Sequence, residues 1–184
     1  MRVLTGANKS RKLLSGVSEA TRPTSSRVRK SVFDILWSRV GIEGKSVLDL
    51  FAGTGAMGIE ALSRGAKEAC FVDRSKRAIG VIKENLRRLE MDPSRYRVVN
   101  SDYSSFLDSY HGNDFDIAFL DPPYAFADWN ELLVRVPAAI MVCETRNPIQ
   151  PPSGLEKLLE RKYGTTLVTL FKASKSAVEK GAVS

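Results

Sequence analysis

The glycine-rich run at residues 53–58, Gly-Thr-Gly-Ala-Met-Gly, constrains the fold more than any other part of the sequence. It follows the apolar run at residues 46–50 and leads into a helical pattern that stops at Gly65. The spacing GxGxxG between a strand and a helix is typical of a βαβ unit that binds a nucleotide, because glycine allows a tight turn and a close approach of the backbone to the ligand. We therefore expect a parallel sheet with a ligand-binding turn after its first strand.

Strand and helix patterns alternate along the rest of the chain. Short apolar runs predict strands at residues 46–50, 69–73, 97–102, 115–120 and 139–144. Apolar residues at helical spacing predict helices at residues 28–40, from the glycine run through 62, at 75–89 and at 129–136, with a short helical stretch around 106–107. Near the C-terminus we expect a short helix at residues 155–160 and a final strand pair or bent strand at 165–171. This order, with nearly continuous apolar strands, indicates a mostly parallel α/β sheet covered on both faces.

Acidic residues lie at or near the ends of the first three predicted strands: Asp49, Asp73 and Asp102. Asp73 follows Gly53 by 20 residues, the spacing of the acid that binds ribose hydroxyls in dinucleotide-binding sites. The pattern alone fits NAD as well as other adenosine cofactors. Near the turn, however, Asp49 would repel a pyrophosphate and attract the ammonium and sulfonium groups of S-adenosylmethionine. Asp102 is placed to accept a hydrogen bond from an adenine amino group.

The apolar run at residues 115–120 ends in Asp121-Pro122-Pro123-Tyr124. Two consecutive prolines fix two φ angles and remove two N–H donors, so this loop is stiff and the Pro122 carbonyl is not used by a local turn. A carboxylate, a carbonyl oxygen and an aromatic ring at one strand end can hold a flat base that carries an amino group. We therefore identify these four residues as the candidate catalytic site, although Tyr124 could instead be a core aromatic residue.

Positive charge is concentrated near the N-terminus, in a segment whose first 20 residues we expect to form a short hairpin or extended arm. Residues 1–45 contain ten Lys and Arg residues and three acids, which accounts for the whole formal net charge of +7. A cationic segment on a neutral body indicates a surface for a polyanion, first of all a nucleic acid, although a solvated basic face would have the same composition. The candidate phosphate contacts are Arg11, Lys12, Arg22, Arg27, Arg29 and Lys30.

The composition argues against several other classes of protein. Hydrophobic residues make up 43% of the chain, as is usual for a globular domain. No apolar run reaches the roughly 18–20 residues of a membrane helix, and the N-terminus lacks the apolar region of a signal peptide. Cys70 and Cys143 lie in apolar runs and are expected to be buried free thiols in a reducing cytoplasm. With one histidine, His111, and no cysteine cluster, we expect no metal site.

Taken together, the motifs resemble the RsmD family of bacterial enzymes, which methylate the N2 amino group of a guanine in 16S ribosomal RNA. The resemblance is carried, in the family's order, by the basic start, Arg22-Pro23-Thr24, residues 29–36 (RKSVFDIL), 48–55 (LDLFAGTG), 60–66 (EALSRGA) and 115–124 (FDIAFLDPPY). Lys30 and Asp73 depart from the family pattern, since both stand where Glu is usual. A shorter acid at position 73 can still reach a ribose, and Lys30 adds charge to the expected RNA face.

The resemblance implies a class I S-adenosylmethionine-dependent methyltransferase fold, which is a Rossmann-like, seven-stranded sheet with an antiparallel final strand and here a basic N-terminal extension. The implied cofactor site comprises Asp49, Phe51, Ala52, Gly53, Thr54, Gly55, Asp73, Asp102 and Tyr103. In this site Asp49 and the glycines would hold the methionine part, Asp73 the ribose and Asp102 the adenine. Residues 121–124 would hold the target base.

The resemblance also implies a partner and a layout of the chain. We expect one methyltransferase domain over residues 1–184, with a basic RNA-binding extension at 1–40, a catalytic core at 41–172 and a flexible tail at 173–184. The expected substrate is 16S ribosomal RNA in a small-subunit particle or assembly intermediate, and the expected protein is a cytoplasmic monomer. The residues themselves also leave open an adenine-N6 methyltransferase of DNA or RNA, an NAD(P)-dependent oxidoreductase and a non-catalytic RNA-binding module.

Overall fold

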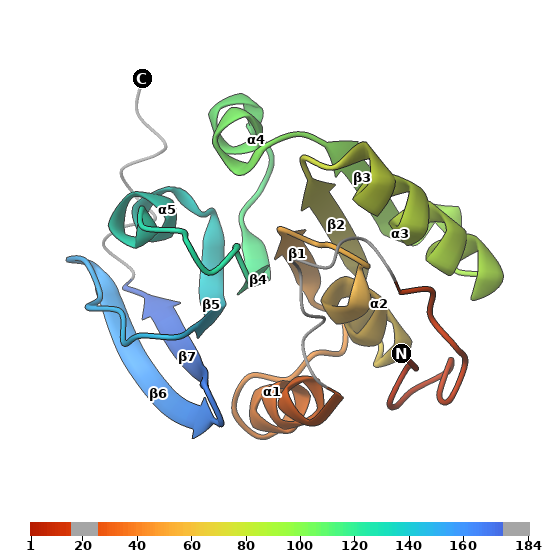
Figure 1. The fold of residues 1–184 in the computed structure, drawn as a ribbon, viewed down its shortest axis with the longest axis horizontal. Helices are drawn as coiled ribbons and strands as arrows, with labels where there is room; N and C mark the ends of the chain where they lie inside the picture. The colour runs from red at the N-terminus through yellow and green to blue at the C-terminus, as the bar shows by residue number, and fades with distance from the viewer. Residues whose placement is uncertain (16–25, 175–184) are drawn as a thin grey trace.

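Seven strands form a single mixed sheet at the centre of the molecule (Figure 1). The computed structural model describes residues 1–15 and 26–174, so Arg22 and the expected tail from residue 175 onward lie outside the described residues. The strand order is β3-β2-β1-β4-β5-β7-β6. The strands are β1 (Ser46–Leu50), β2 (Glu68–Asp73), β3 (Tyr96–Asn100), β4 (Phe115–Leu120), β5 (Ala138–Thr145), β6 (Leu155–Tyr163) and β7 (Thr166–Ala173).

β7 runs antiparallel to both of its neighbours, β5 and β6, and the pairs from β3 through β5 are all parallel. The predicted α/β class, with a mostly parallel sheet and an antiparallel final strand, is therefore confirmed. The connections from β1 to β3 are helical, as parallel pairing requires, because the chain must return to the same edge before each new strand.

Helices cover both faces of the sheet (Figure 1). The helices are α1 (Ser26–Arg39), α2 (Ala56–Ser63), α3 (Lys76–Arg88), α4 (Tyr103–Ser109) and α5 (Trp129–Arg135), with a 3-10 turn at Pro93–Arg95. The first three helices pack on one face, and α4 and α5 pack on the other. Successive residues of a strand point to opposite faces, so Val47 joins the first apolar cluster and Leu48 the second. Burial on both sides explains why the strands are nearly continuous apolar runs.

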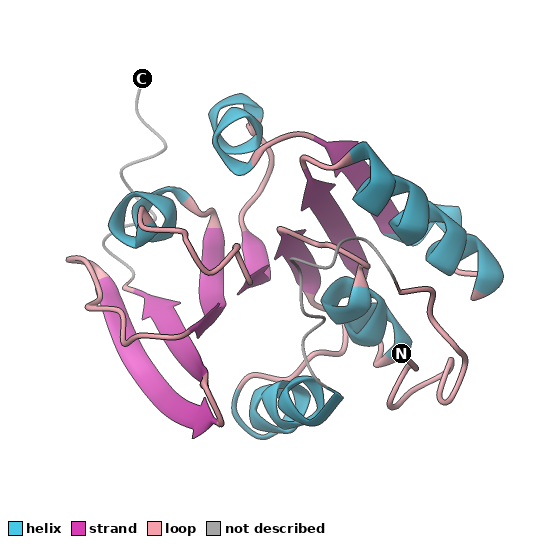
Figure 2. Ribbon diagram, viewed as in Figure 1, coloured by secondary structure: helices cyan, strands magenta, loops and turns pink. Residues whose placement is uncertain are grey.

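The prediction of a helix at residues 155–160 is wrong, because this segment forms the first six of the nine residues of β6 (Figure 2). Leu155, Leu158 and Leu159 have helical spacing, and Glu and Lys between them favour a helix when they are considered alone. Pairing with β7 overrides this local preference. The register shifts between Lys157 and Leu159, and this bulge lets the adjacent residues Leu158 and Leu159 both pack against one cluster, which regular strand alternation forbids.

Residues 1–15, which we call the N-terminal arm, fold back on themselves and lie against α2 and α3 (Figure 1). Arg2 and Lys12 form an antiparallel bridge, as expected for a short hairpin. The backbone N–H groups of Leu4 and Thr5 donate to the Glu60 carboxylate of α2, at 2.7 and 3.0 Å. The arm is therefore attached to the helix that follows the glycine run.

Candidate functional site

The pairing of β1 with β4 creates the point where the strand order reverses. The chain adds β2 and β3 on one side of β1, and β4 and β5 on the other. Leu50 and Leu120 are register partners, so the segments that follow these two residues leave the sheet side by side at its carboxyl edge. One segment is the glycine run and the other is Asp121–Tyr124. Ligands of open α/β sheets bind at such a reversal, and the structure brings the two predicted motifs together there.

The backbone after β1 adopts a sharply turned conformation. Phe51, Gly53 and Gly55 have φ angles of +69°, +55° and +75°, in the region that favours glycine. For Phe51 this geometry is strained, and strain of this kind is concentrated at functional sites. The Gly55 N–H donates to the Ala52 carbonyl at 2.7 Å, and Gly55 precedes the first residue of α2. The predicted cofactor-binding turn is thus a tight loop at a helix N-terminus.

The side chain of Asp49 connects β1 with α2. It is buried and accepts a hydrogen bond from the Gly58 N–H at 2.9 Å. Burial raises the pKa of the Asp49 carboxyl to about 7; the Gly58 hydrogen bond opposes the shift, and the charges of Asp121 and Asp73 add to it. Gly58 also packs tightly on β2, since a Cβ placed there would lie 2.3 Å from the Phe71 ring. Gly58, the third glycine of the run, therefore allows α2 to pack closely against β2.

Asp73 holds the glycine loop in place at the end of β2. One carboxylate oxygen accepts a hydrogen bond from the Gly53 N–H, and the other accepts one from the Ser75 N–H, both at 2.8 Å. A carboxylate has about four acceptor positions, so both oxygens retain capacity for a further donor such as a ribose hydroxyl. The acid that the sequence placed 20 residues after Gly53 thus lies directly against it.

Asp102 caps α4 beyond the end of β3. Its carboxylate accepts hydrogen bonds from the backbone N–H and the hydroxyl of Ser105, and the backbone hydrogen bond is the main reason why the Asp102 pKa is lowered. The adjacent Tyr103 belongs to an aromatic cluster with Phe51 and Phe126, whose ring centroids lie 5.4 to 5.7 Å apart. This cluster spans the ends of β1, β3 and β4 and provides an apolar wall next to the glycine loop.

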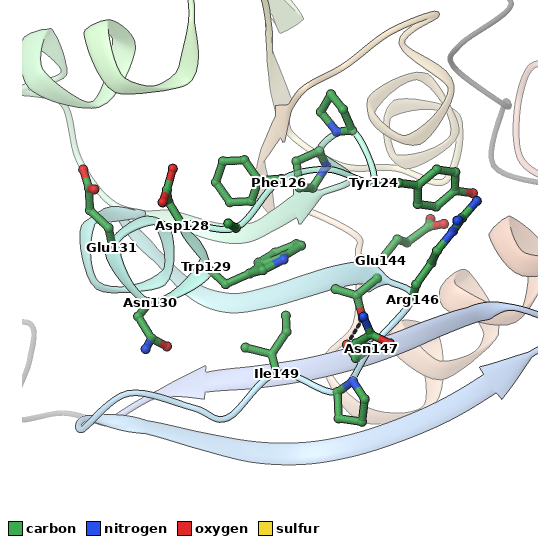
Figure 3. Close-up of a pocket in the computed structure, with 15 residues that line it drawn as sticks. Tyr124, Phe126, Asp128, Trp129, Asn130, Glu131, Glu144, Arg146, Asn147 and Ile149 are labelled. Atoms are coloured by element: carbon green, nitrogen blue, oxygen red, sulfur yellow. Dashed lines mark hydrogen bonds between the residues drawn. The ribbon is translucent and has the colours of Figure 1, made fainter.

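A cavity of about 540 Å³ lies beside Pro122, Pro123 and Tyr124 (Figure 3). It lies between Pro122–Tyr124, the start of α5 and the loop that follows β5, with Glu144, Arg146, Phe126 and Trp129 among its lining residues. Tyr124 is 50% exposed, and the Arg146 guanidinium carbon lies 3.9 Å from its ring centroid. The glycine loop does not line this cavity. Tyr124 therefore lines an open cavity, and it is not a core residue.

The candidate phosphate contacts that lie in the described part of the chain differ in their exposure. Arg11, Lys12, Arg27 and Lys30 are exposed. Arg11 also donates to the carbonyls of Arg88 and Leu89 at the end of α3, and Lys30 pairs with Asp34 at 2.7 Å. Arg29 is completely buried, so the expectation that it contacts phosphate is wrong for this residue. Its guanidinium donates to Met1 Sδ and the Arg2 carbonyl, and it lies 3.9 Å from Glu60.

Three residues of the site were not predicted from the sequence. Glu144 and Arg146 lie at the end of β5 and just beyond it, at the same edge of the sheet as the other site residues, so their position was a usable signal. Asn85 stands on the apolar face of α3, is completely buried and donates to the Thr54 carbonyl of the glycine loop at 3.0 Å. A polar residue within an apolar helical stripe was the signal in that case.

Other expectations concern cysteines, metals and membranes. Cys70 and Cys143 are buried free thiols, as predicted. Among residues 1–15 and 26–174, no group of three or more His, Cys, Asp or Glu side chains is arranged to hold a metal ion. In the same described ranges, no helix combines the length and the apolar character that crossing a membrane requires.

Comparison with known proteins agrees with this arrangement. The family described as Conserved hypothetical protein 95 matches residues 1–172. A Bacillus subtilis protein provisionally named as the rRNA methyltransferase YlbH is 34% identical, over 94% of this chain and 98% of its own. Ribosomal RNA small subunit methyltransferase D of Haemophilus influenzae is 32% identical, over 93% of both chains.

Solved structures show the same fold. A protein of Escherichia coli, provisionally described as the methyltransferase yhhF, superposes with a TM-score of 0.81 at 30% identity, covering 95% of this chain and 98% of the other. A match over nearly the whole length means that the sheet, the glycine loop and the N-terminal arm belong to one shared architecture. The chain belongs to the Conserved hypothetical protein 95 family, the RsmD family, and has the class I methyltransferase fold.

Proposed function

We propose that this protein transfers the methyl group of S-adenosylmethionine to the exocyclic N2 amino group of a specific guanine in 16S ribosomal RNA. The main support for this proposal is that the glycine loop after β1 and the Asp121–Tyr124 loop after β4 lie side by side where the strand order reverses. One loop suits an adenosine cofactor, and the other suits a base that carries an amino group. Relatives named as small subunit rRNA methyltransferases support the ribosomal substrate.

The cofactor site that we propose follows the contacts of the glycine loop. Asp49, with Gly53 and Gly55, forms the side that receives the methionine part, where the negative charge of Asp49 attracts its ammonium and sulfonium groups. Asp73 has spare acceptor capacity for the ribose hydroxyls. Asp102 and the ring of Tyr103 line the adenine side, with Phe51, Ala52 and Thr54 completing the wall.

The target base is held by the rigid loop. Asp121 and the Pro122 carbonyl accept the two N–H bonds of the amino group, which orients the nitrogen lone pair toward the methyl group that S-adenosylmethionine supplies on its sulfonium. Positive charge develops on this nitrogen during transfer, and the Asp121 carboxylate stabilises it. The extra proton of the alkylated nitrogen then leaves to Asp121 or water. Pro123 keeps the loop stiff, and Tyr124 stacks on the base, which must leave its helix to reach the site.

The nucleic-acid surface that we propose is formed by exposed cations of the N-terminal segment. Arg11, Lys12, Arg27 and Lys30 are the described members, and Arg22 is proposed from the sequence. Such contacts position an RNA through its phosphates and carry no base specificity themselves. We further propose that the substrate is a small-subunit particle or assembly intermediate and that the protein acts as a cytoplasmic monomer in which residues 1–40 serve RNA binding.

The decisive experiment is methyl transfer from labelled S-adenosylmethionine to 16S ribosomal RNA and to immature small subunits, followed by mass spectrometry of the nucleosides. We expect N2-methylguanosine at one position. Asp121→Ala should abolish transfer while leaving cofactor binding by calorimetry intact, and Asp121→Asn should retain part of the orientation but lose the charge. Equal labelling by wild type and Asp121→Ala would contradict the proposed mechanism.

The methylated nucleoside and the cofactor that binds distinguish the proposed function from its alternatives. A loop that holds an amino group also fits adenine, so N6-methyladenosine in RNA or DNA would replace the guanine proposal with an adenine-N6 methyltransferase. Tight NAD binding without S-adenosylmethionine binding would indicate an oxidoreductase. RNA binding with neither cofactor would indicate a non-catalytic module.

A further inference from the structure

Asn85 joins two parts of the molecule that are far apart in sequence. Its side chain is completely buried in α3. The amide oxygen accepts a hydrogen bond from the Leu14 N–H at 2.7 Å, and the amide nitrogen donates to the carbonyls of Leu14 at 3.4 Å and Thr54 at 3.0 Å. One side chain thus binds both the end of the N-terminal arm and the middle of the glycine loop.

Contacts with α2 and α3 along its length hold the N-terminal arm in place, so Leu14 is in a fixed position to bind Asn85. Ala7 N–H and Asn8 N–H donate to the carbonyl and hydroxyl oxygens of Ser63, each at 3.0 Å. Gly6 lies so close to α2 that a Cβ there would come within 1.7 Å of the Ser63 carbonyl oxygen. At the opposite end of the arm, Arg11 donates to the last carbonyls of α3.

Side chains from β2 and α3 form hydrogen bonds to the backbone of the glycine loop at two adjacent residues. Its turned conformation is strained at Phe51. Asp73 fixes the loop at Gly53, and Asn85 fixes it one residue later at Thr54. Binding a ligand to a loop is tighter when the loop is already held in its bound shape, because less conformational entropy is lost.

We propose that Asn85 is a positioning residue which couples docking of the N-terminal arm to the affinity of the glycine loop for S-adenosylmethionine. The arm is then a structural part of the cofactor site as well as a cationic surface. Coupling of this kind is reciprocal, so cofactor binding must also stabilise the docked arm. The inference rests on the proposed cofactor role of the glycine loop, but not on the identity of the methylated base.

The test measures S-adenosylmethionine binding by calorimetry in the full-length protein. Asn85→Leu has similar size but removes all three hydrogen bonds, and we expect its dissociation constant to rise roughly tenfold. Gly6→Ala displaces the arm without touching the loop or Asn85, and we expect an increase of several-fold. The double variant should bind no more weakly than Asn85→Leu alone, because both changes break the same connection.

Gly80→Ala is the matched control, because this glycine lies in α3 and a Cβ there meets nothing within 4 Å. Its cofactor affinity should equal that of wild type. An unchanged dissociation constant in Gly6→Ala, or additive effects in the double variant, would overturn the coupling. Failure of wild type to bind S-adenosylmethionine would instead overturn the proposed function.

Hydrogen exchange provides a readout that a purely structural role would not change. In wild type, the cofactor should slow exchange of the Leu14 amide, which donates to Asn85 and does not belong to the glycine loop. The cofactor should have no such effect in Asn85→Leu. Equal protection of Leu14 in the two proteins would show that the arm and the loop are not coupled through this residue.

Discussion

Asp49 accepts a hydrogen bond of 2.9 Å from the backbone N–H of Gly58, which ties a carboxyl group with 4% exposure to the helix that follows the glycine loop. Burial raises the pKa of this carboxyl to about 7 despite that hydrogen bond. The group therefore changes charge close to neutral pH, whereas an ordinary aspartate remains ionised there. A cationic ligand that meets Asp49 must favour its ionised form.

The first prediction concerns the pH dependence of cofactor affinity. As the pH falls from 8 to 6, protonation of Asp49 removes the charge that attracts S-adenosylmethionine, so wild type should lose several-fold in affinity. Asp49→Asn keeps an oxygen to accept from Gly58 but cannot ionise. Its affinity for S-adenosylmethionine should be lower than that of wild type at pH 8. The ratio of the two dissociation constants should approach one at pH 6, and any titration of the cofactor itself cancels in this ratio. Calorimetry at both values measures this ratio, and a constant ratio would contradict the role of Asp49.

The stability of the same two proteins provides an independent check. The folded pKa of Asp49 lies above its unfolded value, so protonation stabilises the fold at low pH and this stabilisation is lost as the pH rises from about 4 through about 7. Asp49→Asn has no such loss at this position. Its free energy of unfolding, relative to wild type, should therefore increase between pH 5 and pH 8 in denaturant titrations.

The second prediction concerns the contact between α2 and β2. A Cβ at position 58 would lie 2.3 Å from the Phe71 ring, which is completely buried and cannot move away freely. Gly58→Ala should lower the free energy of unfolding by about 1–3 kcal/mol through overpacking. Gly80→Ala, in an open position of α3, should instead leave stability unchanged or raise it by up to about 1 kcal/mol. Thermal unfolding compares the two, and equal effects would show that the tight contact is relieved at little cost.

Much of this fold could be predicted because the signals were local. A strand buried on both faces is an apolar run, and Ser75 caps α3 by accepting from the Ala78 N–H, as a serine before a helix is expected to do. The β6 segment could not be identified in this way. Its leucines have helical spacing, and only the hydrogen bonds to β7 and the bulge after Lys157 make it a strand.

Some residues of the candidate site could likewise be predicted from local sequence signals, and others could not. Gly53, Asp73 and Asp121 lie at or just beyond the ends of predicted strands, so the rule that parallel strands end at one edge was enough to place them together. Arg29 was misassigned because charge was counted along the chain, whereas its environment depends on Glu60 in another helix. Asn85 escaped notice because its partners, Leu14 and Thr54, are separated from it by 71 and 31 residues.

The third prediction concerns Tyr124 as a platform for the target base. Removal of the ring in Tyr124→Ala should cost roughly 1–3 kcal/mol of stacking, which raises the KM for RNA by about 5- to 150-fold with little change in cofactor affinity. Tyr124→Phe keeps the ring and should behave almost as wild type. Because Arg146 lies 3.9 Å from the ring centroid, Arg146→Ala tests whether this cation assists or competes with the base. Steady-state kinetics with RNA as the varied substrate would contradict the platform if Tyr124→Ala left KM unchanged.

The fourth prediction separates two adjacent basic residues of α1. Arg29 is buried against Glu60, and burial lowers its pKa while the Glu60 charge opposes this effect. Arg29→Ala leaves a cavity and removes a charge partner from the interior, so the free energy of unfolding should fall by about 3 kcal/mol. Lys30 is exposed and forms an ion pair with Asp34 one turn further along the same helix, so Lys30→Ala should have the same free energy of unfolding as wild type.

RNA binding should rank these two variants in the opposite order. Lys30→Ala should weaken binding to all RNA sequences alike and reduce the slope of log affinity against log salt concentration by about one, because one phosphate contact is lost. Arg29→Ala, measured where it remains folded, should keep the wild-type slope, since a buried guanidinium releases no counterion from RNA. Filter binding across a salt series distinguishes the two. A reduced slope in Arg29→Ala would mean that this side chain leaves the interior when RNA binds, because no other route allows it to reach a phosphate.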